Sequence, residues 1–447
     1  MSESVVDVID VLDARVEGML DACTQCGKCV EVCPMPALDD LSVPAPGAVM
    51  GGVLEFLRAA GDSQMSPATF PEASRRWAEI CSGSGHCIEA CPEDLNPRFL
   101  LAMARRGLTK TQGRSQRRES GRAQFQKMSR GVRLLSRLQL SPALLERLSP
   151  ASHPHTDVPP DLVFYTGCNL LKTPHIGLLC LDVLDRLGSR YEVHGGPSSC
   201  CGILQMRGGD DENALRQGGR TLQAFANTQT SQVLSWCPTC QMQFAETTFP
   251  VQLGAGAFEP AAPSFDMTMF PVYLASRLGD LSAHMTHRVE KRVAIHEHPG
   301  TPGVVEAVRA LVNAVPGVEL VELDIPRVGY SVNALAAVPG EQKASLAREL
   351  ARAQALGVDM LVSVYHTEHR EFAAHAEHWP FEVGNYMELV GASMGIAHDD
   401  IFKRLHAMND VDAIIEASAE TLHANGVDFE QARDAVARML DDHILEV

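Results

Sequence analysis

Cysteine spacing constrains this chain more than any other feature of its sequence. All thirteen cysteines lie at or before Cys240, and twelve of them fall into three groups with regular spacing. The spacings C-x2-C and C-x3-C place thiolates on tight loops that suit a metal centre, and the cytosol keeps such thiols reduced. We therefore expect metal-bound cysteines rather than disulfides. The thirteenth, Cys180, lies in an apolar run and is expected in the core.

Length and composition set the class of the protein. A chain of 447 residues with 45% hydrophobic residues can form about two to four domains, each with its own core. The sequence has no run of eighteen apolar residues, and its acidic N-terminus lacks the basic and apolar regions of a signal peptide. We therefore expect a cytoplasmic protein. The net charge of −18 argues against nucleic acid as its main partner.

One segment is basic against this acidic background. Between Ala104 and Pro150, twelve Arg and Lys stand against Glu119 and Glu146 alone. Residues 124–148 have a helical pattern in which apolar residues recur on one side: Phe125, Met128, Val132, Leu135 and Leu138. The segment is interpreted as a solvated connector helix, or as a surface that docks on a partner or an acidic membrane. In the second case the protein would lie at the inner face of the membrane through a partner protein.

Periodicity divides the chain into five parts. Residues 1–103 alternate helical pieces with the first two cysteine groups, and residues 104–158 form the basic linker. Short β-rich runs then alternate with longer helical stretches, which is typical of parallel α/β units. The expected strands are Leu162–Tyr165, Val233–Trp236, Val293–His296, Val318–Leu323 and Leu361–Tyr365. They form two similar blocks, 159–288 and 289–400, and a helical tail follows at 401–447.

The first cysteine group has the spacing of a cubane iron–sulfur site. It consists of Cys23, Cys26, Cys29 and Cys33, followed by Pro34, in the pattern C-x2-C-x2-C-x3-C-P. In this pattern three thiolates hold one cluster and the fourth reaches a second cluster. A zinc site would not need the fourth cysteine. We therefore assign a 4Fe-4S cluster to this group.

The second group lacks one thiolate. It has the pattern C-x5-C-x3-C-P, at Cys81, Cys87, Cys91 and Pro92. Ser84 stands where the first group has Cys26. Three thiolates suit a 3Fe-4S cluster, although Ser84 or His86 can complete a 4Fe-4S cluster, and the site can also be empty. The pattern, with Leu95-Asn96-Pro97 after it, resembles the 3Fe-4S segment of succinate dehydrogenase iron–sulfur subunits, and we favour that cluster.

Two-cluster ferredoxins share their cysteines crosswise between the clusters. The same arrangement here would give the first cluster the ligands Cys23, Cys26, Cys29 and Cys91, and the second cluster Cys33, Cys81 and Cys87. Two clusters this close would conduct electrons. Residues 1–103 are therefore predicted to be a mostly helical, ferredoxin-like domain.

The third group combines an adjacent cysteine pair with two more distant positions. Its members are Cys168, Cys200, Cys201, Cys237 and Cys240. The run Cys200-Cys201-Gly202 resembles the CCG domain of B-type heterodisulfide reductase proteins, and the domain order over roughly residues 15–390 resembles the fused, D-type proteins of that family. The resemblance implies that these five cysteines hold a noncubane 4Fe-4S cluster that cleaves a disulfide, with Cys200 and Cys201 as catalytic residues.

The second α/β block repeats this spacing without cysteine. Cys201 and Cys237 are 36 positions apart, as are Tyr330 and His366, so that Gly329-Tyr330 replaces the cysteine pair. Histidines stand near the other cysteine positions: His296, His298, His366 and His369. Imidazole suits zinc or a mononuclear iron. Two alternatives are a lost cluster site repacked with polar residues, and a substrate-binding or proton-donating pocket.

The sequence thus predicts an α/β fold class, with a helical two-cluster ferredoxin-like domain followed by two related α/β CCG-type domains. The predicted function is that of an iron–sulfur oxidoreductase subunit, in which electrons reach a noncubane cluster that reduces or forms a disulfide or related thiol-sulfur substrate. No glycine-rich dinucleotide fingerprint follows a strand, so we expect a flavoprotein or other electron-transfer subunit as partner. The alternatives are a non-catalytic subunit that links a flavoprotein dehydrogenase to quinone or a membrane partner, and a sulfur-handling or assembly scaffold.

Overall fold

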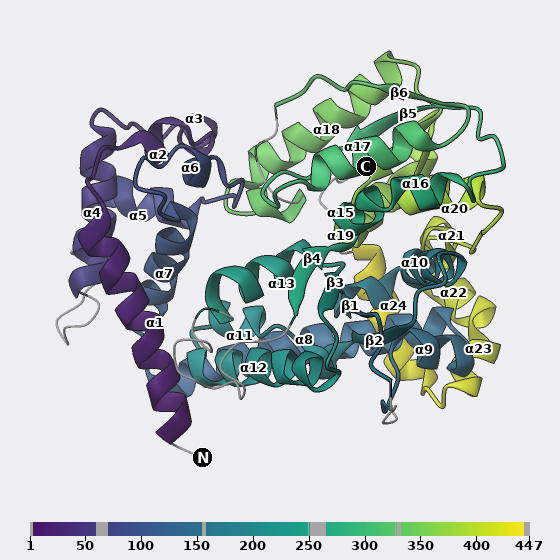
Figure 1. Ribbon diagram of the computed structural model, residues 1–447, viewed down its shortest axis with the longest axis horizontal. Helices are drawn as coiled ribbons and strands as arrows, with labels where there is room; N and C mark the ends of the chain where they lie inside the picture. The colour runs from purple at the N-terminus through teal and green to yellow at the C-terminus, as the bar shows by residue number, and fades with distance from the viewer. Residues whose placement is uncertain are drawn as a thin grey trace.

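The fold has an N-terminal helical region, two α/β blocks and a C-terminal group of helices, coloured from purple to yellow in Figure 1. The computed structural model describes residues 3–59, 70–153, 158–248, 250, 265–326, 328 and 332–441. The expected fold class, a helical ferredoxin-like region followed by α/β units, is confirmed. The domain limits drawn from the sequence stay predictions.

The N-terminal region is built from helices of unequal length. They are α1 (Glu3–Ala22), α2 (Lys28–Glu31), α3 (Met35–Leu38), α4 (Pro46–Ala59), α5 (Glu72–Glu79), α6 (His86–Glu89) and α7 (Pro97–Thr109). Leu12, Val16 and Leu20 recur at helical spacing on α1 and are buried. At the other end of the region, α7 starts where the Asn96 side chain accepts a hydrogen bond from the Phe99 N–H at 2.9 Å.

The basic segment forms two helices rather than the one that its pattern predicts. α8 (Arg114–Gln139) ends before Ser141, which caps α9 (Pro142–Leu148), and Pro142 cannot continue a helix. The predicted apolar side of α8 faces inward, since Val132, Leu135 and Leu138 are buried. None of the described helices is both long and apolar enough to cross a membrane.

The first α/β block contains a parallel four-stranded sheet in the order β2-β1-β3-β4. Its strands are β1 (Leu162–Gly167), β2 (Tyr191–Gly195), β3 (Gln232–Ser235) and β4 (Asp266–Met269). Its helices are α10 (Pro174–Arg186), α11 (Ile203–Arg207), α12 (Asp211–Asn227), α13 (Pro238–Gln243), α15 (Phe270–Ser276) and α16 (Leu278–Ser282).

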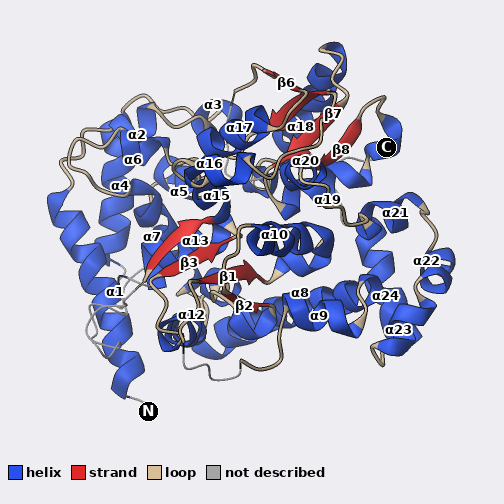
Figure 2. Ribbon diagram, turned by 45° about the vertical axis from the view of Figure 1, so that its right-hand side comes forward, coloured by secondary structure: helices blue, strands red, loops and turns tan. Residues whose placement is uncertain are grey.

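The second block repeats this topology with its own sheet, in the order β6-β5-β7-β8. Its strands are β5 (Lys291–His296), β6 (Val318–Val321), β7 (Met360–Ser363) and β8 (Glu382–Asn385), and its helices are α17 (Val304–Ala314), α18 (Pro339–Ala355), α19 (His366–Ala374) and α20 (Tyr386–Ser393). Figure 2 shows the strands of the two sheets as separate groups. All five predicted strands are present, whereas β2, β4 and β8, each at a sheet edge, were not predicted.

A shared core joins the two blocks. Trp236 and Phe270 of the first block belong to the same buried cluster as Tyr365 and Tyr386 of the second. The Trp236 ring lies edge-on to Tyr365, with ring centroids 5.8 Å apart, and parallel to Tyr386 at 6.2 Å. Such aromatic contacts are dry and specific. The blocks therefore hold a fixed mutual orientation.

The C-terminal tail covers the basic helix α8. It consists of α21 (Ile401–Ala407), α22 (Val411–Ala417), α23 (Ala419–Ala424) and α24 (Phe429–Asp441). Leu135 and Leu138 share one buried cluster with Ile414, Leu422 and Val436 of this tail. α8 is therefore less exposed than a solvated connector would be, because the tail buries its apolar side.

Candidate iron–sulfur sites

The cysteines of the first two groups line two separate cavities. The first cavity is lined by Cys23, Cys26 and Cys29 of the first group together with Cys91 of the second. The second cavity is lined by Cys81 and Cys87 of the second group together with Cys33 of the first. The two groups thus exchange one cysteine each, in the crossed order expected from their spacing.

Local geometry repeats between the two cysteine groups. Gly27 begins α2 with a φ of 79°, and Gly85 begins α6 with a φ of 87°. A side chain at Gly27 would also meet the backbone of Gly47 at 2.5 Å. Ser84 precedes Gly85 as Cys26 precedes Gly27, and it lines the second cavity. His86, the other candidate for a missing ligand, is not among the residues that line this cavity.

Burial of these thiols shows what kind of ligand they can be. Burial raises the pKa of Cys29 and of Cys87 to about 12. A thiol with this pKa becomes a thiolate at neutral pH only beside a cation. The thiol sets therefore fit a cationic, thiolate-ligated centre such as an iron–sulfur cluster.

Arg98 connects the second cavity to both α/β blocks. Its side chain is buried, and its Nη1 donates hydrogen bonds to the Gly83 carbonyl at 2.8 Å and the Gly300 carbonyl at 2.9 Å. It also forms an ion pair with Glu246 of the first block. Arg98 lines the cavity and lowers the pKa of Cys87, although burial outweighs this effect. A fixed positive charge therefore lies beside the second site.

The third group of cysteines gathers at one edge of the first sheet. Cys168 directly follows β1, Cys200 follows β2 after a short turn, and Cys237 lies two residues beyond β3. These are the carboxyl ends of three neighbouring parallel strands, where α/β folds form their binding sites. All five cysteines of the group are buried.

Hydrogen bonds connect the thiols of the third group. Bonds with the thiols of Cys168 and Cys201, and with the backbone N–H of Gly202 at 3.4 Å, lower the pKa of Cys200 to about 4, although burial opposes this shift. Tyr165 Oη lies 3.5 Å from Cys240 Sγ. Five thiols linked in a chain of hydrogen bonds, with the pKa lowered at Cys200 and Cys237, suit a cationic sulfur-ligated centre.

The glycine after the cysteine pair has a steric role. Gly202 has a φ of +85°, and a Cβ atom there would lie 2.3 Å from the Ala214 carbonyl oxygen. Any other residue would push α11 away from α12. The glycine therefore sets how closely the loop that bears Cys200 and Cys201 packs on the block.

The histidines of the second block are held by separate carboxylates. His296 Nδ1 lies 2.7 Å from Glu349 Oε1, and His298 Nδ1 lies 3.1 Å from Glu368 Oε1. Burial lowers the pKa of His296, but the charge and hydrogen bond of Glu349, together with the nearby charges of Glu368 and Glu297, outweigh burial and leave that pKa above its usual value. The His298 ring lies edge-on to Tyr365, with centroids 4.6 Å apart.

The other two predicted histidines also have different surroundings. Burial lowers the pKa of His366 to about 3, so this imidazole is neutral at physiological pH. His369 Nε2 instead contacts Asp400 Oδ2 at 2.7 Å. Within the described part of the chain, the four predicted histidines do not bring their ligand atoms within 4.8 Å of one another. His296, His298 and His369 each lie beside a different carboxylate. Gly329 and Tyr330 lie outside the described residues.

The structure places His369 in a group that the sequence did not reveal. His175, His369, Glu388 and Asp400 bring their ligand atoms within 4.8 Å of one another. Asp400 caps α21, and Glu388 belongs to the capping box of α20. Helix capping is therefore enough to explain why the sequence has an acidic residue at each position. No spacing rule relates them to His175.

Comparison with known proteins agrees with this arrangement. Residues 18–95 match a 4Fe-4S dicluster domain, and residues 162–245 match a cysteine-rich domain. The chain is 24% identical over 327 residues to the D-type subunit of the dihydromethanophenazine:CoB–CoM heterodisulfide reductase of Methanosarcina mazei, a match that covers 68% of this chain and 75% of the relative. The protein of the same name from Methanosarcina acetivorans is also 24% identical, with the same coverage. No solved structure matches.

Proposed function

We propose that this chain, which is similar to heterodisulfide reductase iron–sulfur subunits, passes electrons through two N-terminal clusters to a third centre, where a disulfide or related thiol-sulfur compound is reduced or formed. Cys168, Cys200, Cys201, Cys237 and Cys240 would hold this third centre. The observation that carries the proposal is the burial of these five thiols together at the carboxyl edge of β1, β2 and β3.

The ligand sets support a different cluster at each site. The cavity with four cysteines suits a 4Fe-4S cluster. The cavity with three cysteines and Ser84 suits a 3Fe-4S cluster, or a 4Fe-4S cluster with the serine hydroxyl as a ligand. The five cysteines of the third group suit the noncubane 4Fe-4S cluster that the resemblance implies. Bound clusters would supply single-electron transfer at each site.

Burial of the cysteines supports an electron path that runs from the surface to the interior of the protein. Cys26 of the first cavity is exposed, Cys33 and Cys81 of the second are intermediate, and all five cysteines of the third group are buried. Arg98 joins the second cavity to both blocks. A partner at the surface would thus exchange electrons at the first site, and the second site would relay them inward.

The third site would act on a substrate that consumes two electrons. Reduction of a disulfide breaks the S–S bond, takes up two electrons and two protons and releases two thiols. The five cysteines would hold the centre, with Cys200 and Cys201 nearest to the reaction. A flavoprotein or other electron-transfer subunit would deliver or collect the electrons, consistent with relatives that are named as subunits.

Reoxidation by a disulfide tests this function. Protein purified without oxygen is reduced with dithionite, freed of excess reductant, and mixed with glutathione disulfide and then cystine while cluster absorbance is followed. We expect reoxidation in the parent protein and in the control Cys180→Ala, whose buried thiol lies outside the five. Cys200→Ser should abolish reoxidation and leave the two N-terminal clusters intact.

One observation favours a second function. Cysteines are absent from the second block, so only one α/β block has a thiol set. The chain would then be a non-catalytic subunit that carries electrons between a flavoprotein and quinone or a membrane partner. Clusters that stay reduced with every disulfide but are oxidised by a soluble quinone would select this function and reject the first.

A further inference from the structure

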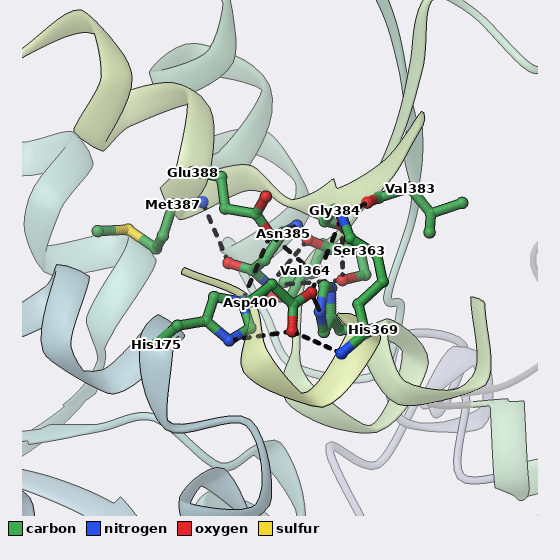
Figure 3. Close-up of polar contacts among 11 residues, drawn as sticks. His175, Ser363, Val364, His369, Val383, Gly384, Asn385, Met387, Glu388 and Asp400 are labelled. Atoms are coloured by element: carbon green, nitrogen blue, oxygen red, sulfur yellow. Dashed lines mark hydrogen bonds and ion pairs between the residues drawn. The ribbon is translucent and has the colours of Figure 1, made fainter. Parts of the chain in front are cut away.

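Four buried side chains from distant parts of the chain meet beside the contact between the two blocks. His175 lies on α10 of the first block, His369 on α19 and Glu388 on α20 of the second, and Asp400 at the start of α21. Figure 3 shows His175 and His369 on either side of Asp400, with Glu388 above them. One ligand atom from each residue lies within 4.8 Å of the others.

Three of the four nitrogens of these two imidazoles have no hydrogen bond among the described residues. Among the described residues, neither nitrogen of His175 has a hydrogen-bond partner, although this side chain is only 2% exposed. Its Nε2 lies 3.5 Å from Glu388 Oε1, and its Nδ1 lies 3.5 Å from Asp400 Oδ1. His369 is fully buried; its Nε2 contacts Asp400, and its Nδ1 has no hydrogen-bond partner. Buried polar nitrogens without partners are costly and call for an explanation.

The carboxylates are held in place from outside the group. Glu388 Oε1 accepts a hydrogen bond from the Asn385 N–H at 2.8 Å, and Asp400 Oδ1 accepts one from the Lys403 N–H at 3.0 Å. Such outer contacts orient the ligands of protein metal sites. The Lys403 ammonium is also nearby, 3.9 Å from Asp400 Oδ2. The group is therefore positioned before any ion binds.

We propose that His175, His369, Glu388 and Asp400 bind one divalent zinc-type cation. Two neutral imidazoles and two carboxylates form a four-coordinate set of nitrogen and oxygen ligands, which suits zinc. The two carboxylate charges balance the charge of the ion in a buried site. One nitrogen of each imidazole would bind the ion, so that His175, which has no hydrogen bond among the described residues, would gain a partner. This site shares only His369 with the histidine set expected from the sequence.

The ion would act as a clamp between the blocks. Its ligands come from the first block, the second block and the start of the C-terminal helices, which are far apart in the sequence. α10 and α20 are already in contact, so the ion would fix a packing that exists. This role is structural and does not depend on the electron-transfer function proposed above.

Zinc content and zinc X-ray absorption of the full-length, cluster-loaded protein test the site. We expect about one zinc per chain after dialysis against added zinc, with nitrogen and oxygen neighbours at about 2.0–2.1 Å and no sulfur at about 2.3 Å. His175→Gln and His369→Gln should lose this zinc. His375→Gln should keep it, because His375 is equally buried beside α19 but lies outside the group.

Unchanged iron content and circular dichroism confirm that each variant is folded. Should His175→Gln alone fail to fold, Asp400→Asn is the second test, and it too should lose the zinc. Absence of bound zinc in the folded parent protein would overturn the proposal. Sulfur neighbours would also overturn it, since they place the zinc on cysteines, as would zinc that stays in every ligand variant. Failure to reduce disulfides would leave the zinc result unaffected.

Discussion

The two α/β blocks have the same strand order but carry different ligand groups at the same edge of the sheet. In the first block the carboxyl ends of β1, β2 and β3 carry five buried cysteines. In the second block the ends of β5 and β7 carry histidines and a glutamate, paired as His298 with Glu368. Both edges face the shared core around Trp236 and Tyr365. One backbone arrangement thus supports two different sets of donors.

The difference shows that the strand topology determines the spacing of the ligand positions along the chain, whereas the residue at each position determines which ligand it offers. His366 lies shortly after β7, as Cys237 lies shortly after β3. In each block, the helix and strand that come before this position set its distance along the chain from Cys201 in the first block and from Tyr330 in the second. A thiolate at that place is a soft ligand for iron, whereas the neutral, buried imidazole of His366 is a borderline ligand and has no cysteine of its own block beside it. The second edge can therefore support the first without holding a cluster.

The largest expected effect comes from substituting, in separate variants, the two residues at this matched pair of positions, Cys237 and His366. Cys237→Ser should remove the third cluster, so that iron falls by about four atoms per chain and disulfide-dependent reoxidation is lost. His366→Gln should leave iron and acid-labile sulfide unchanged. Both are measured on protein purified without oxygen. Equal iron loss in the two variants would show that the second edge also holds the cluster, and would break the comparison.

The N-terminal cysteine groups offer the reverse experiment, because there the second copy lacks a ligand. Ser84→Cys restores the missing thiol in the cavity lined by Cys33, Cys81 and Cys87. We expect the electron paramagnetic resonance signal of an oxidised 3Fe-4S cluster to disappear and a reducible 4Fe-4S cluster to replace it. Ser82→Cys is the control, since Ser82 lines the same cavity but does not correspond to Cys26. If the parent protein lacks the 3Fe-4S signal at full iron loading, Ser84 already acts as a ligand.

Sequence spacing predicted the parts of the molecule that local geometry determines. Short loops carry the cysteines, so the crossed grouping of Cys33 and Cys91 could be expected from the pattern alone. The central strands β1, β3, β5 and β7 have apolar runs and were predicted, as was the edge strand β6. The edge strands β2 and β4 mix polar residues into their runs, and β8 is the tetrapeptide Glu-Val-Gly-Asn, so none of them has the pattern of a buried strand.

Tertiary packing determined the rest. His175 and Asp400 meet only because α10 packs against the second block and α21 starts beside α19. No periodicity links positions so far apart, and Asp400 has a sufficient local explanation as a helix cap. The tail that covers α8 is unpredictable for the same reason: its partner lies far away along the chain.

Acid should affect stability through the second block. His366 has a folded-state pKa of about 3 against the usual 6.5, so between these values the unfolded chain binds a proton that the folded chain does not. The contribution of His366 to the free energy of unfolding is complete above about pH 6.5 and is lost as pH falls. The loss between pH 7.5 and pH 5.5 is about 1.4 kcal/mol. Anaerobic denaturant unfolding should show that His366→Gln loses less stability over this range than the parent. An identical pH dependence would place His366 in contact with water.

The smallest expected effect is a difference in how the loss of a hydroxyl group changes stability at two buried tyrosines, Tyr165 and Tyr365. Tyr165 of the first block donates a hydrogen bond from its hydroxyl to the Ser199 carbonyl at 2.8 Å, whereas the buried Tyr365 hydroxyl of the second block has no hydrogen-bond partner in the described part of the chain. Tyr165→Phe should therefore lower the free energy of unfolding by about 1 kcal/mol, and Tyr365→Phe should leave it unchanged or raise it slightly. Equilibrium unfolding in denaturant measures both. A loss of stability in Tyr365→Phe equal to that in Tyr165→Phe would mean that the hydroxyl contacts a group at the edge of the third site, and the two edges would then be chemically coupled rather than merely packed together.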